Sequence, residues 1–354
     1  RAYVGSGDGY VYCLEAATGR HLWEFRAAPV ERRITLFDHL VSTWPVNSGV
    51  LVEDGVAYFA AGIIDHDGTY VYAVDATTGK IKWQNNSSGH LSRELRKGVS
   101  VQGNLSIKGN QLLLAGGNQV SPAAFDRETG KCLAKPFDQG RPKANAGRFV
   151  GVFRDDTIIA GGRVLYSDPR NVSTKGSFVA RSRKRGLPLN FGGVPPAWDD
   201  GTLALVNFKH GKITCCEAPK VAERIEKGFP EATDRRRWRA NLAEVLREDG
   251  ALRWQQDLGE TERFEAISLV VARNAVVAVV TFQPRNRSQP QWVVAAFNKR
   301  NGRPLFRREL GSEPLPDGLL VDREGHVVVT MLDGSLVYLV PRPPRPRGDR
   351  RVRD

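Results

Sequence analysis

Short apolar runs with alternating polar positions follow one another along this chain. Residues 10–14 and 70–74 alternate in this way and are rich in β-branched and aromatic side chains, which is typical of half-buried β-strands. Residues 56–61, 111–115 and 157–160 form further apolar runs, and a glycine follows each of them. Glycines after a strand mark tight turns or a close approach of the backbone. The pattern therefore predicts short antiparallel strands rather than helices.

One turn sequence recurs four times, in residues 14–23, 74–83, 125–133 and 297–306. In its clearest copy, Asp75 can accept hydrogen bonds from backbone amides two or three residues further on, and Gly79 supplies a positive φ. Glu15 and Asn298 take the aspartate position in two other copies, and we expect them to be weaker substitutes. Each unit is then a strand, a turn, a strand, an Asp-x-x-Thr-Gly turn and a further strand, which together make one small antiparallel sheet.

The spacing of these turns predicts the architecture. The Thr-Gly glycines are residues 19, 79 and 130, and Asn-Gly and Asp-Gly pairs end at residues 302 and 250. Steps of 60, 51 and 52 residues separate 19 from 79, 79 from 130 and 250 from 302, which fits a four-stranded propeller blade. An aromatic residue after the turn can wedge between neighbouring sheets, with an indole N–H on a backbone acceptor. The structural repeat residues are Thr18, Gly19, Trp23, Asp75, Thr78, Gly79, Trp83, Asp126, Thr129, Gly130, Gly250, Trp254 and Gly302.

Residues 73–83 match Ala-x-Asp-x-x-Thr-Gly-x-x-x-Trp at every fixed position. This motif resembles the tryptophan-docking repeat of pyrroloquinoline-quinone-type (quinoprotein-like) β-propellers. The resemblance implies an all-β propeller of four-stranded antiparallel blades, with about seven blades visible here and about eight in the full ring. It also implies a bacterial protein in the periplasm or outside the cell. Many members of this family carry the repeat and bind no quinone.

We expect three segments. Residues 1–340 form the propeller, which begins with Arg1 inside a strand and not with methionine, so we interpret the chain as a fragment that lacks part of a first blade. Residues 219–248 contain apolar positions at helical spacing among many charges, which predicts a helical insertion within a blade. The insertion either contacts partners at a rim of the ring or simply covers a blade edge. Residues 341–354 form a basic, Pro/Arg-rich disordered tail.

The chain of 354 residues carries a formal net charge of +13. The excess concentrates in residues 163–185 and in the tail. Few aromatic residues are interleaved with either run, so we expect no specific binding of nucleic acid. Solvated loops explain the charge best, and a weak contact of the tail with anionic surfaces stays open. No signal peptide and no apolar stretch of about 18 residues occur in the sequence, so no transmembrane segment is expected.

One feature invites a test for quinone chemistry. Quinone-dependent alcohol dehydrogenases of the superfamily carry a vicinal disulfide beside the cofactor, and this chain has the pair Cys215-Cys216. The pair lies in a predicted strand before Glu217, and not in a loop facing the channel, which argues against that role. Such enzymes also need calcium ligands, an aspartate base and a tryptophan floor, and no Glu, Asn and Asp set here matches the ligand motifs of that family. We predict no catalytic, cofactor-binding or metal-binding residues.

Other candidate sites are weak. The six histidines have no metal-ligand spacing, and Asp65-His66-Asp67-Gly68 lacks the glutamate of a calcium loop and is better explained as a hairpin turn. Residues 27–46 and 166–198 are irregular and longer than a blade turn, so we expect them to cover an end of the central channel and to hold any small-ligand site.

Three hypotheses follow. The first is a non-catalytic scaffold, outside the cytoplasm, that binds proteins or a ligand at the channel mouth. The second is a dehydrogenase of alcohols or sugars that depends on pyrroloquinoline quinone and calcium. The third is a sensor or a carbohydrate-binding module of a larger protein.

Overall fold

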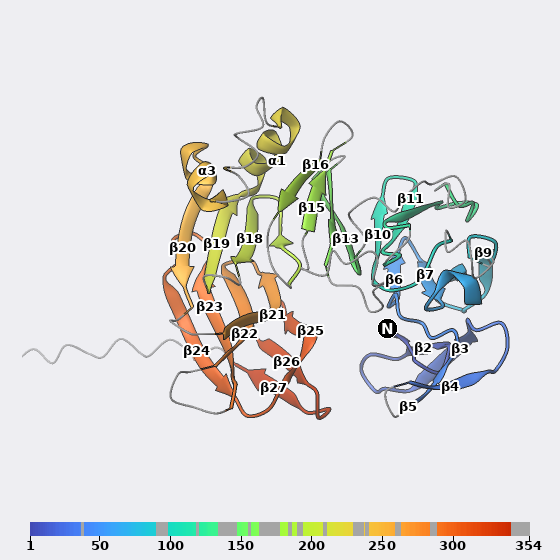
Figure 1. The fold of residues 1–354 in the computed structure, drawn as a ribbon. Coiled ribbons are helices and arrows are strands. Elements are labelled where there is room, and N and C mark those ends of the chain that lie inside the picture. Colours follow the sequence, from blue (N-terminus) through green and yellow to red (C-terminus); the bar gives the residue numbers. More distant parts are fainter. Residues whose placement is uncertain are drawn as a thin grey trace, which may run out of the picture. The chain divides into compact units, whose positions relative to one another are not determined.

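In the computed structural model, the chain folds into two compact units, and Figure 1 shows their strands and helices coloured along the sequence. The first comprises residues 1–195 and 217–252, and the second residues 196–216 and 253–354. The described residues are 1–36, 39–89, 98–117, 120–133, 147–154, 157–162, 178–182, 186–189, 194–207, 211–228, 237, 241–258, 263–283 and 289–340.

The first unit is built from small antiparallel sheets whose strands follow chain order. Its sheets are β1–β2–β3, β6–β7–β8–β9, β10–β11–β12 and β13–β14–β15–β16, with β4–β5 as a separate hairpin. The bounds are β1 Ala2–Gly5, β2 Tyr10–Leu14, β3 His21–Arg26, β4 Arg33–Leu36, β5 His39–Ser42, β6 Leu51–Glu53, β7 Val56–Ala61, β8 Tyr70–Asp75, β9 Ile81–Asn85, β10 Leu105–Lys108, β11 Gln111–Leu114, β12 Ala123–Asp126, β13 Phe149–Arg154, β14 Thr157–Gly161, β15 Phe178–Arg181 and β16 Gly186–Leu189.

The second unit repeats this plan with the sheets β17–β18–β19–β20, β21–β22–β23–β24 and β25–β26–β27. Of the residues in these strands, only the last of β19, Glu217, and the first of β20, Leu252, belong to the first unit. The bounds are β17 Ala197–Trp198, β18 Thr202–Asn207, β19 Lys212–Glu217, β20 Leu252–Asp257, β21 Arg263–Val271, β22 Ala275–Gln283, β23 Gln291–Asn298, β24 Pro304–Leu310, β25 Pro314–Val321, β26 Val327–Met331 and β27 Leu336–Leu339.

The prediction of an all-β chain made of small antiparallel sheets is confirmed. Three of these sheets contain three strands and not four among the described residues, so the four-stranded pattern does not hold throughout and the number of blades stays a prediction. The prediction that residues 27–46 and 166–198 are irregular is wrong, because the hairpin β4–β5 lies inside the first segment and β15, β16 and β17 lie inside the second. The alternation of apolar and polar residues is broken in β5, where Leu40 and Val41 are adjacent apolar residues and Leu40 is exposed.

The core consists of layers between successive sheets. Phe59 and Tyr72 of sheet β6–β9 pack with Val11 of the preceding sheet. Tyr58 and Val71 of the same sheet lie in a second cluster with residues of β10–β12. Because neighbouring side chains of a strand point to opposite faces, a sheet covered on both faces has almost no polar position. This explains why β7 is an unbroken apolar run.

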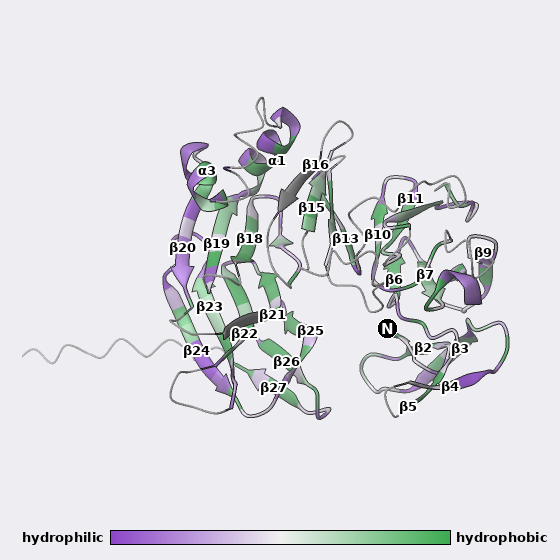
Figure 2. Cartoon of the chain, viewed as in Figure 1, coloured by the Kyte–Doolittle hydropathy of each residue, from purple (hydrophilic) through white to green (hydrophobic). Residues whose placement is uncertain are grey.

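The outer strand β20 is more polar than the central strands of its sheet. In the sheet β17–β20, Figure 2 shows hydrophobic colours on β18 and β19 and hydrophilic colours on β20. The central positions of β19, such as Ile213 and Cys215, are fully buried. A strand at the edge of a sheet faces solvent on one side and therefore carries charged and amide side chains. The hydropathy of β20 thus agrees with its position at the edge of the sheet.

Two of the described helices lie in the connection between β19 and β20. Helix α1, Ala218–Lys227, buries Ala218, Val221 and Ile225, and helix α3, Leu242–Glu248, buries Val245 and Leu246. The spacing of the buried residues in α1 is that of one helical face. Arg224 of α1 forms an ion pair with Asp249, which follows α3. Within the described residues, every helix is too short or too polar to cross a membrane.

Candidate functional site

The repeated turns are held by their own side chains. In the first unit, Asp75 Oδ1 accepts hydrogen bonds from the amides of Thr77 and Thr78 at 3.0 and 2.8 Å, and from the Thr78 hydroxyl at 2.8 Å. Gly79 has a φ of 71°, which few side-chain-bearing residues adopt. The hydrogen bonds from Thr78, first from its hydroxyl and then from its amide, lower the pKa of Asp75. The carboxylate is therefore a structural acceptor.

The turn at Asp126 has the same geometry, and the substituted turns have fewer bonds. Asp126 Oδ1 accepts from the amide and the hydroxyl of Thr129, both at 2.8 Å, and these bonds lower its pKa. Asn298 Oδ1 accepts from two backbone amides at 3.0 and 3.3 Å. Glu15, which is one methylene longer, accepts the Thr18 hydroxyl at 2.6 Å. Glu15 differs through its longer side chain, whereas Asn298 lacks the hydroxyl donor because Asn301 takes the threonine position of that turn.

Three tryptophans contact the next turn in their own unit. Trp23 Nε1 donates to the carbonyl of Ala76 at 3.3 Å, and Trp83 Nε1 donates to that of Arg127 at 2.9 Å. In the second unit Trp254 Nε1 donates to the carbonyl of Lys299 at 3.0 Å. Each indole thus places its only polar atom on a backbone acceptor.

The indole also occupies the space beside the turn glycine. A Cβ placed on Gly130 would lie 2.4 Å from Trp83, and one on Gly302 would lie 2.7 Å from Trp254. A Cβ on Gly79 would lie 3.0 Å from Trp23. These glycines therefore serve two purposes, since they provide both the positive φ and the room for a ring. The sequence alone suggested only the first.

Two other repeat glycines have different surroundings. A Cβ on Gly19 would meet nothing within 4 Å, so only its φ of 73° demands glycine. Gly250 has a φ of 64° and follows α3, and its nearest foreign atom is Lys220 Nζ, not an indole. The Asp-Gly pair there ends a helix, so Gly250 differs from the turn glycines with which the sequence grouped it.

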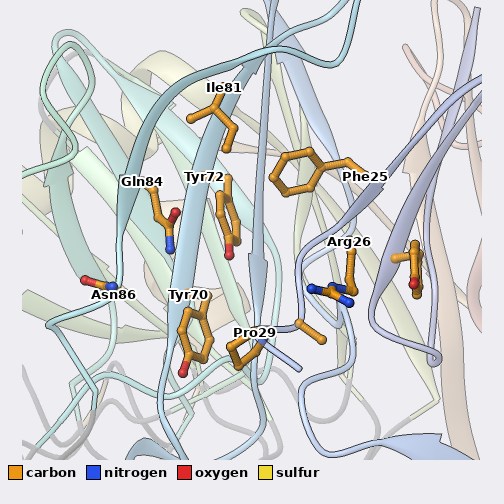
Figure 3. A pocket seen from close by; sticks show the side chains of 10 residues that line it. Phe25, Arg26, Pro29, Tyr70, Tyr72, Ile81, Gln84 and Asn86 are labelled. Atoms are coloured by element: carbon orange, nitrogen blue, oxygen red, sulfur yellow. The ribbon is translucent and has the colours of Figure 1, made fainter. Parts of the chain in front are cut away.

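An open groove lies in the first unit between the sheets β1–β3 and β6–β9. It has a volume of about 750 Å³. Figure 3 shows Tyr70, Tyr72 and Gln84 facing Phe25 and Arg26 across it. The lining residues are Tyr10, Phe25, Arg26, Ala28, Pro29, Tyr70, Tyr72, Ile81, Gln84 and Asn86. Sequence reasoning missed this groove, because its residues come from two sheets whose packing against each other the local sequence pattern does not show.

A hydrogen bond and a ring contact hold Tyr72 in place in the groove. Tyr72 donates its hydroxyl to the carbonyl of Ala27 at 3.0 Å, and its ring lies 5.0 Å from that of Phe25. Burial raises the pKa of Tyr72 to about 12, the neighbouring Tyr70 acts in the same direction, and the positive charge of Arg26 opposes both. Tyr72 is therefore neutral at any physiological pH.

The vicinal cysteines lie in strand β19, as the sequence suggested, and both are fully buried. Cys215 Sγ donates to the carbonyl of Lys299 at 3.7 Å, the same acceptor that Trp254 uses. Of the two other cysteines, Cys13 is buried in β2 and Cys132 is partly exposed. The setting of Cys215 is that of a packed strand.

Asp65–Asp67 form one turn of 3-10 helix between the paired strands β7 and β8. Asp65 is buried, and its Oδ2 accepts the amide of Gly98 at 2.9 Å. The segment is thus a turn within a hairpin, and Asp65 ties it to the chain that follows β9. Residues 163–177 and 183–185, which carry much of the basic charge, and the tail 341–354 lie outside the described residues.

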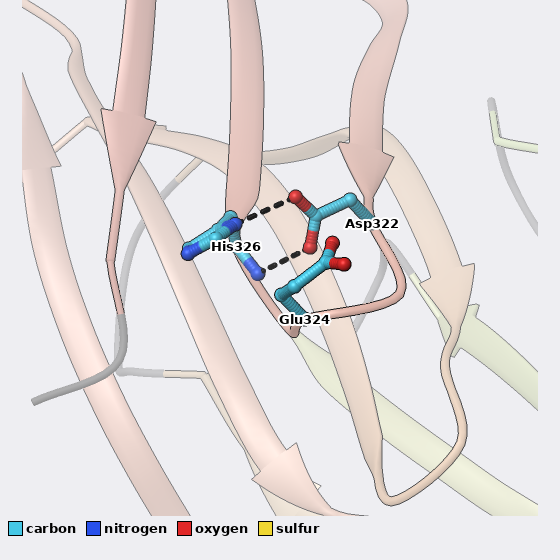
Figure 4. Close-up of side chains that lie close together, drawn as sticks. All are labelled: Asp322, Glu324 and His326. Atoms are coloured by element: carbon cyan, nitrogen blue, oxygen red, sulfur yellow. Dashed lines mark hydrogen bonds and ion pairs between the residues drawn. The ribbon is translucent and has the colours of Figure 1, made fainter. Parts of the chain in front are cut away.

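Within the described part of the chain, one group of side chains offers three potential metal ligands close together. They are Asp322, Glu324 and His326, in the turn between β25 and β26. Figure 4 shows the imidazole and backbone amide of His326 meeting the carboxylate of Asp322. The His326 Nδ1 and Asp322 Oδ2 atoms are 2.6 Å apart. Partial desolvation acts to raise the pKa of Asp322, but the bonds from His326 hold it below its usual value. The turn accounts for this cluster without an ion.

Residues 1–219 match the family model described as "Outer membrane protein assembly factor BamB". The chain belongs to this BamB family. The resemblance to quinoprotein-like propeller repeats is thereby confirmed. The matched segment contains the groove and the turns at Asp75 and Asp126, and it ends within the first turn of α1. No curated protein matches the chain in sequence.

The solved structures that resemble the chain include two with low sequence identity to it. BamB from Moraxella catarrhalis is 14% identical, with a TM-score of 0.47, over 96% of this chain and 85% of that one. The Dos1 propeller is 12% identical, with a TM-score of 0.52, over 95% of this chain and 74% of that one. The second likeness agrees with a propeller fold, which is the most that such an identity supports.

Proposed function

We propose that this chain is a non-catalytic β-propeller scaffold that holds partner proteins outside the cytoplasm. The observation that carries the proposal is membership of the BamB family over residues 1–219. The description of that family names outer membrane protein assembly, so a bacterial periplasmic location and a role in an assembly follow for this chain as parts of the proposal.

The local chemistry supports a structural role for the repeat. The carboxylates of Asp75 and Asp126 are engaged by their own turns, and Trp23, Trp83 and Trp254 donate to backbone carbonyls. We infer that these three indoles dock neighbouring blades. Such contacts give a rigid frame, and a rigid frame lowers the entropic cost of holding a partner.

Affinity capture tests the scaffold proposal. The full chain, carrying an affinity tag, is incubated with a membrane and periplasm extract of the source organism, and retained proteins are identified by mass spectrometry. We expect reproducible capture of envelope proteins that a tagged unrelated β-propeller does not retain. Absence of any enriched protein, also after chemical cross-linking, would contradict the proposal.

Helix α1 offers a first place to look for a contact surface. Glu223 and Glu226 are exposed on it, away from the buried Val221 and Ile225. The double variant Glu223→Lys, Glu226→Lys should leave the melting temperature unchanged and reduce capture if the insertion contacts a partner. Unchanged capture would mean that the insertion only covers the fold.

The dehydrogenase alternative has a direct test. We expect neither tight binding of pyrroloquinoline quinone in the presence of calcium, measured by calorimetry, nor dye-linked oxidation of alcohols or sugars. Tight binding together with turnover would replace the scaffold proposal with an enzymatic one. Binding of a sugar without turnover would favour the carbohydrate-binding alternative.

A further inference from the structure

We propose that the groove between the sheets β1–β3 and β6–β9 binds an extended peptide segment of a partner protein, in which an aromatic side chain is followed by a carboxylate. The inference deepens the scaffold function proposed above and rests on it, because it names the chemistry of the partner. Nothing in the family description assigns a ligand to this groove.

The groove has the size and rigidity of a recognition site. Its volume of about 750 Å³ falls in the range of ligand pockets, about 300–1,000 Å³. Tyr70 and Tyr72 are more than nine-tenths buried although they line it. The ring of Phe25 meets that of Tyr72 edge-on at 69°, and the ring of Trp44 meets that of Tyr70 at 88°. A preformed aromatic floor of this kind can take an aromatic side chain with little loss of conformational entropy.

The charge at the groove selects an anionic ligand. Among the described residues that line it, Arg26 is the only charged one, and none is a carboxylate. Within the described part of the chain, Arg26 is exposed and forms no ion pair. Its charge nevertheless reaches the groove, since it opposes the rise that burial causes in the pKa of Tyr72. A guanidinium beside an aromatic floor fits a carboxylate next to an aromatic group, because it can donate two parallel hydrogen bonds.

The backbone around the groove favours a peptide over a sugar. Strands β3 and β9, which supply Phe25, Arg26, Ile81 and Gln84, are the last strands of their sheets in the described part of the chain. The outer N–H and C=O groups of such an edge strand can pair with an added strand. Ile81 is 54% exposed, so it gives an added strand an apolar contact. Gln84 and Asn86, both exposed at the groove, can bond a peptide backbone.

The test uses three synthetic peptides of about eight residues, a length within the usual range of strands, about 3–10 residues. The first has a phenylalanine followed by two aspartates, flanked by threonines. The second has asparagines in place of the aspartates, and the third has alanine in place of the phenylalanine. Binding to the full chain is measured by fluorescence anisotropy, and maltoheptaose and chitohexaose are tested as competitors.

Three variants separate the groove from the surface around it. Arg26→Gln and Gln84→Ala change groove residues, whereas Lys82→Gln changes an exposed residue of β9 outside the lining. All three side chains are exposed, so the melting temperature should not move. Arg26→Gln should weaken binding of the aspartate peptide by about tenfold, the scale of a charge-assisted hydrogen bond, and should leave the asparagine peptide almost unaffected. Lys82→Gln should change neither.

A photoreactive benzoylphenylalanine in place of the peptide's phenylalanine should cross-link to residues 25–29 or 70–86. The proposal is overturned if the aspartate peptide does not bind, if it binds no better than the other two, if Arg26→Gln has no effect, or if cross-links map elsewhere. Absence of peptide binding, together with direct binding of either saccharide measured by calorimetry, would instead identify a sugar site.

Capture from the envelope extract keeps the two proposals apart. If the wild-type chain and the Arg26→Gln, Gln84→Ala double variant capture the same proteins, the scaffold function stands and the groove is not its contact surface. If the wild-type chain captures none, the scaffold function itself fails, whatever the peptides show.

Discussion

At the scale of single residues, the repeated turn combines three constraints that the sequence displays separately. Asp75 satisfies the amides of Thr77 and Thr78, the glycine at 79 permits the positive φ, and the indole of Trp23 lies against that glycine. The first two act within one turn, whereas the third joins one sheet to the next. The conformational and the packing demands on a glycine can therefore be separated by mutation.

Gly130→Ala should destabilise the chain more than Gly19→Ala. Both glycines have φ near 72°, so both variants carry the cost of a left-handed residue, about 1–2 kcal/mol. A Cβ on Gly130 would also lie 2.4 Å from the Trp83 ring, which adds about 1–3 kcal/mol of overpacking. Denaturant unfolding of both variants measures the difference. Equal losses of unfolding free energy would show that the Trp83 ring can move away from an added Cβ without cost.

The turn aspartates make stability depend on pH. The pKa of Asp75 is lower when folded than when unfolded, so its contribution is present above the unfolded value, about 3.9, and is lost as the pH falls through the folded value. Asp75→Asn should therefore reduce stability at pH 6, and the difference from wild type should shrink below about pH 4.

Asn298→Asp provides the reverse test in another copy of the turn, since Asn298 already accepts two amides there. It should add stability at pH 6 and lose this gain in acid. A difference between Asp75→Asn and wild type that stays constant from pH 6 to pH 3 would argue against the role assigned to the carboxylate.

At the scale of elements, position within a sheet sets what each strand contributes. Strand β7 is central and its sheet is covered on both faces, so Phe59 is fully buried. Strand β6 is at the edge of the same sheet, and Val52 on it is 40% exposed. The sequence predicts both as β-strands, but they differ in how deeply their side chains are buried and therefore in how much these side chains stabilise the fold.

Phe59→Ala should cost about 3–5 kcal/mol, because it leaves a cavity between two sheets. Val52→Ala, in the same sheet, should change stability by no more than about 0.5 kcal/mol. Chemical denaturation monitored by tryptophan fluorescence gives both values. Similar losses for the two variants would mean that the layer around Phe59 can collapse into the space.

At the scale of the whole molecule, charge is the property most easily tested. The net charge is +13, and residues 341–354 contribute six arginines against two aspartates. Cationic segments bind anionic bilayers by about 1 kcal/mol for each Lys or Arg near the surface. Removing these residues should therefore weaken sedimentation with vesicles that contain phosphatidylserine and should leave the melting temperature unchanged. Equal sedimentation of both forms, or the same binding to neutral vesicles, would exclude the tail as the contact.

The sequence by itself determined the kind of element and the repeat, because strand alternation and turn chemistry act between residues close in the chain. The Asp-x-x-Thr-Gly turns at Asp75 and Asp126 formed as their local pattern indicates. The hairpin β4–β5 escaped notice because its alternation is weak. Only the tertiary structure decided which indole lies on which glycine and which side chains line the groove. Phe25 and Tyr72 stand 47 positions apart in the chain and meet because two sheets pack face to face.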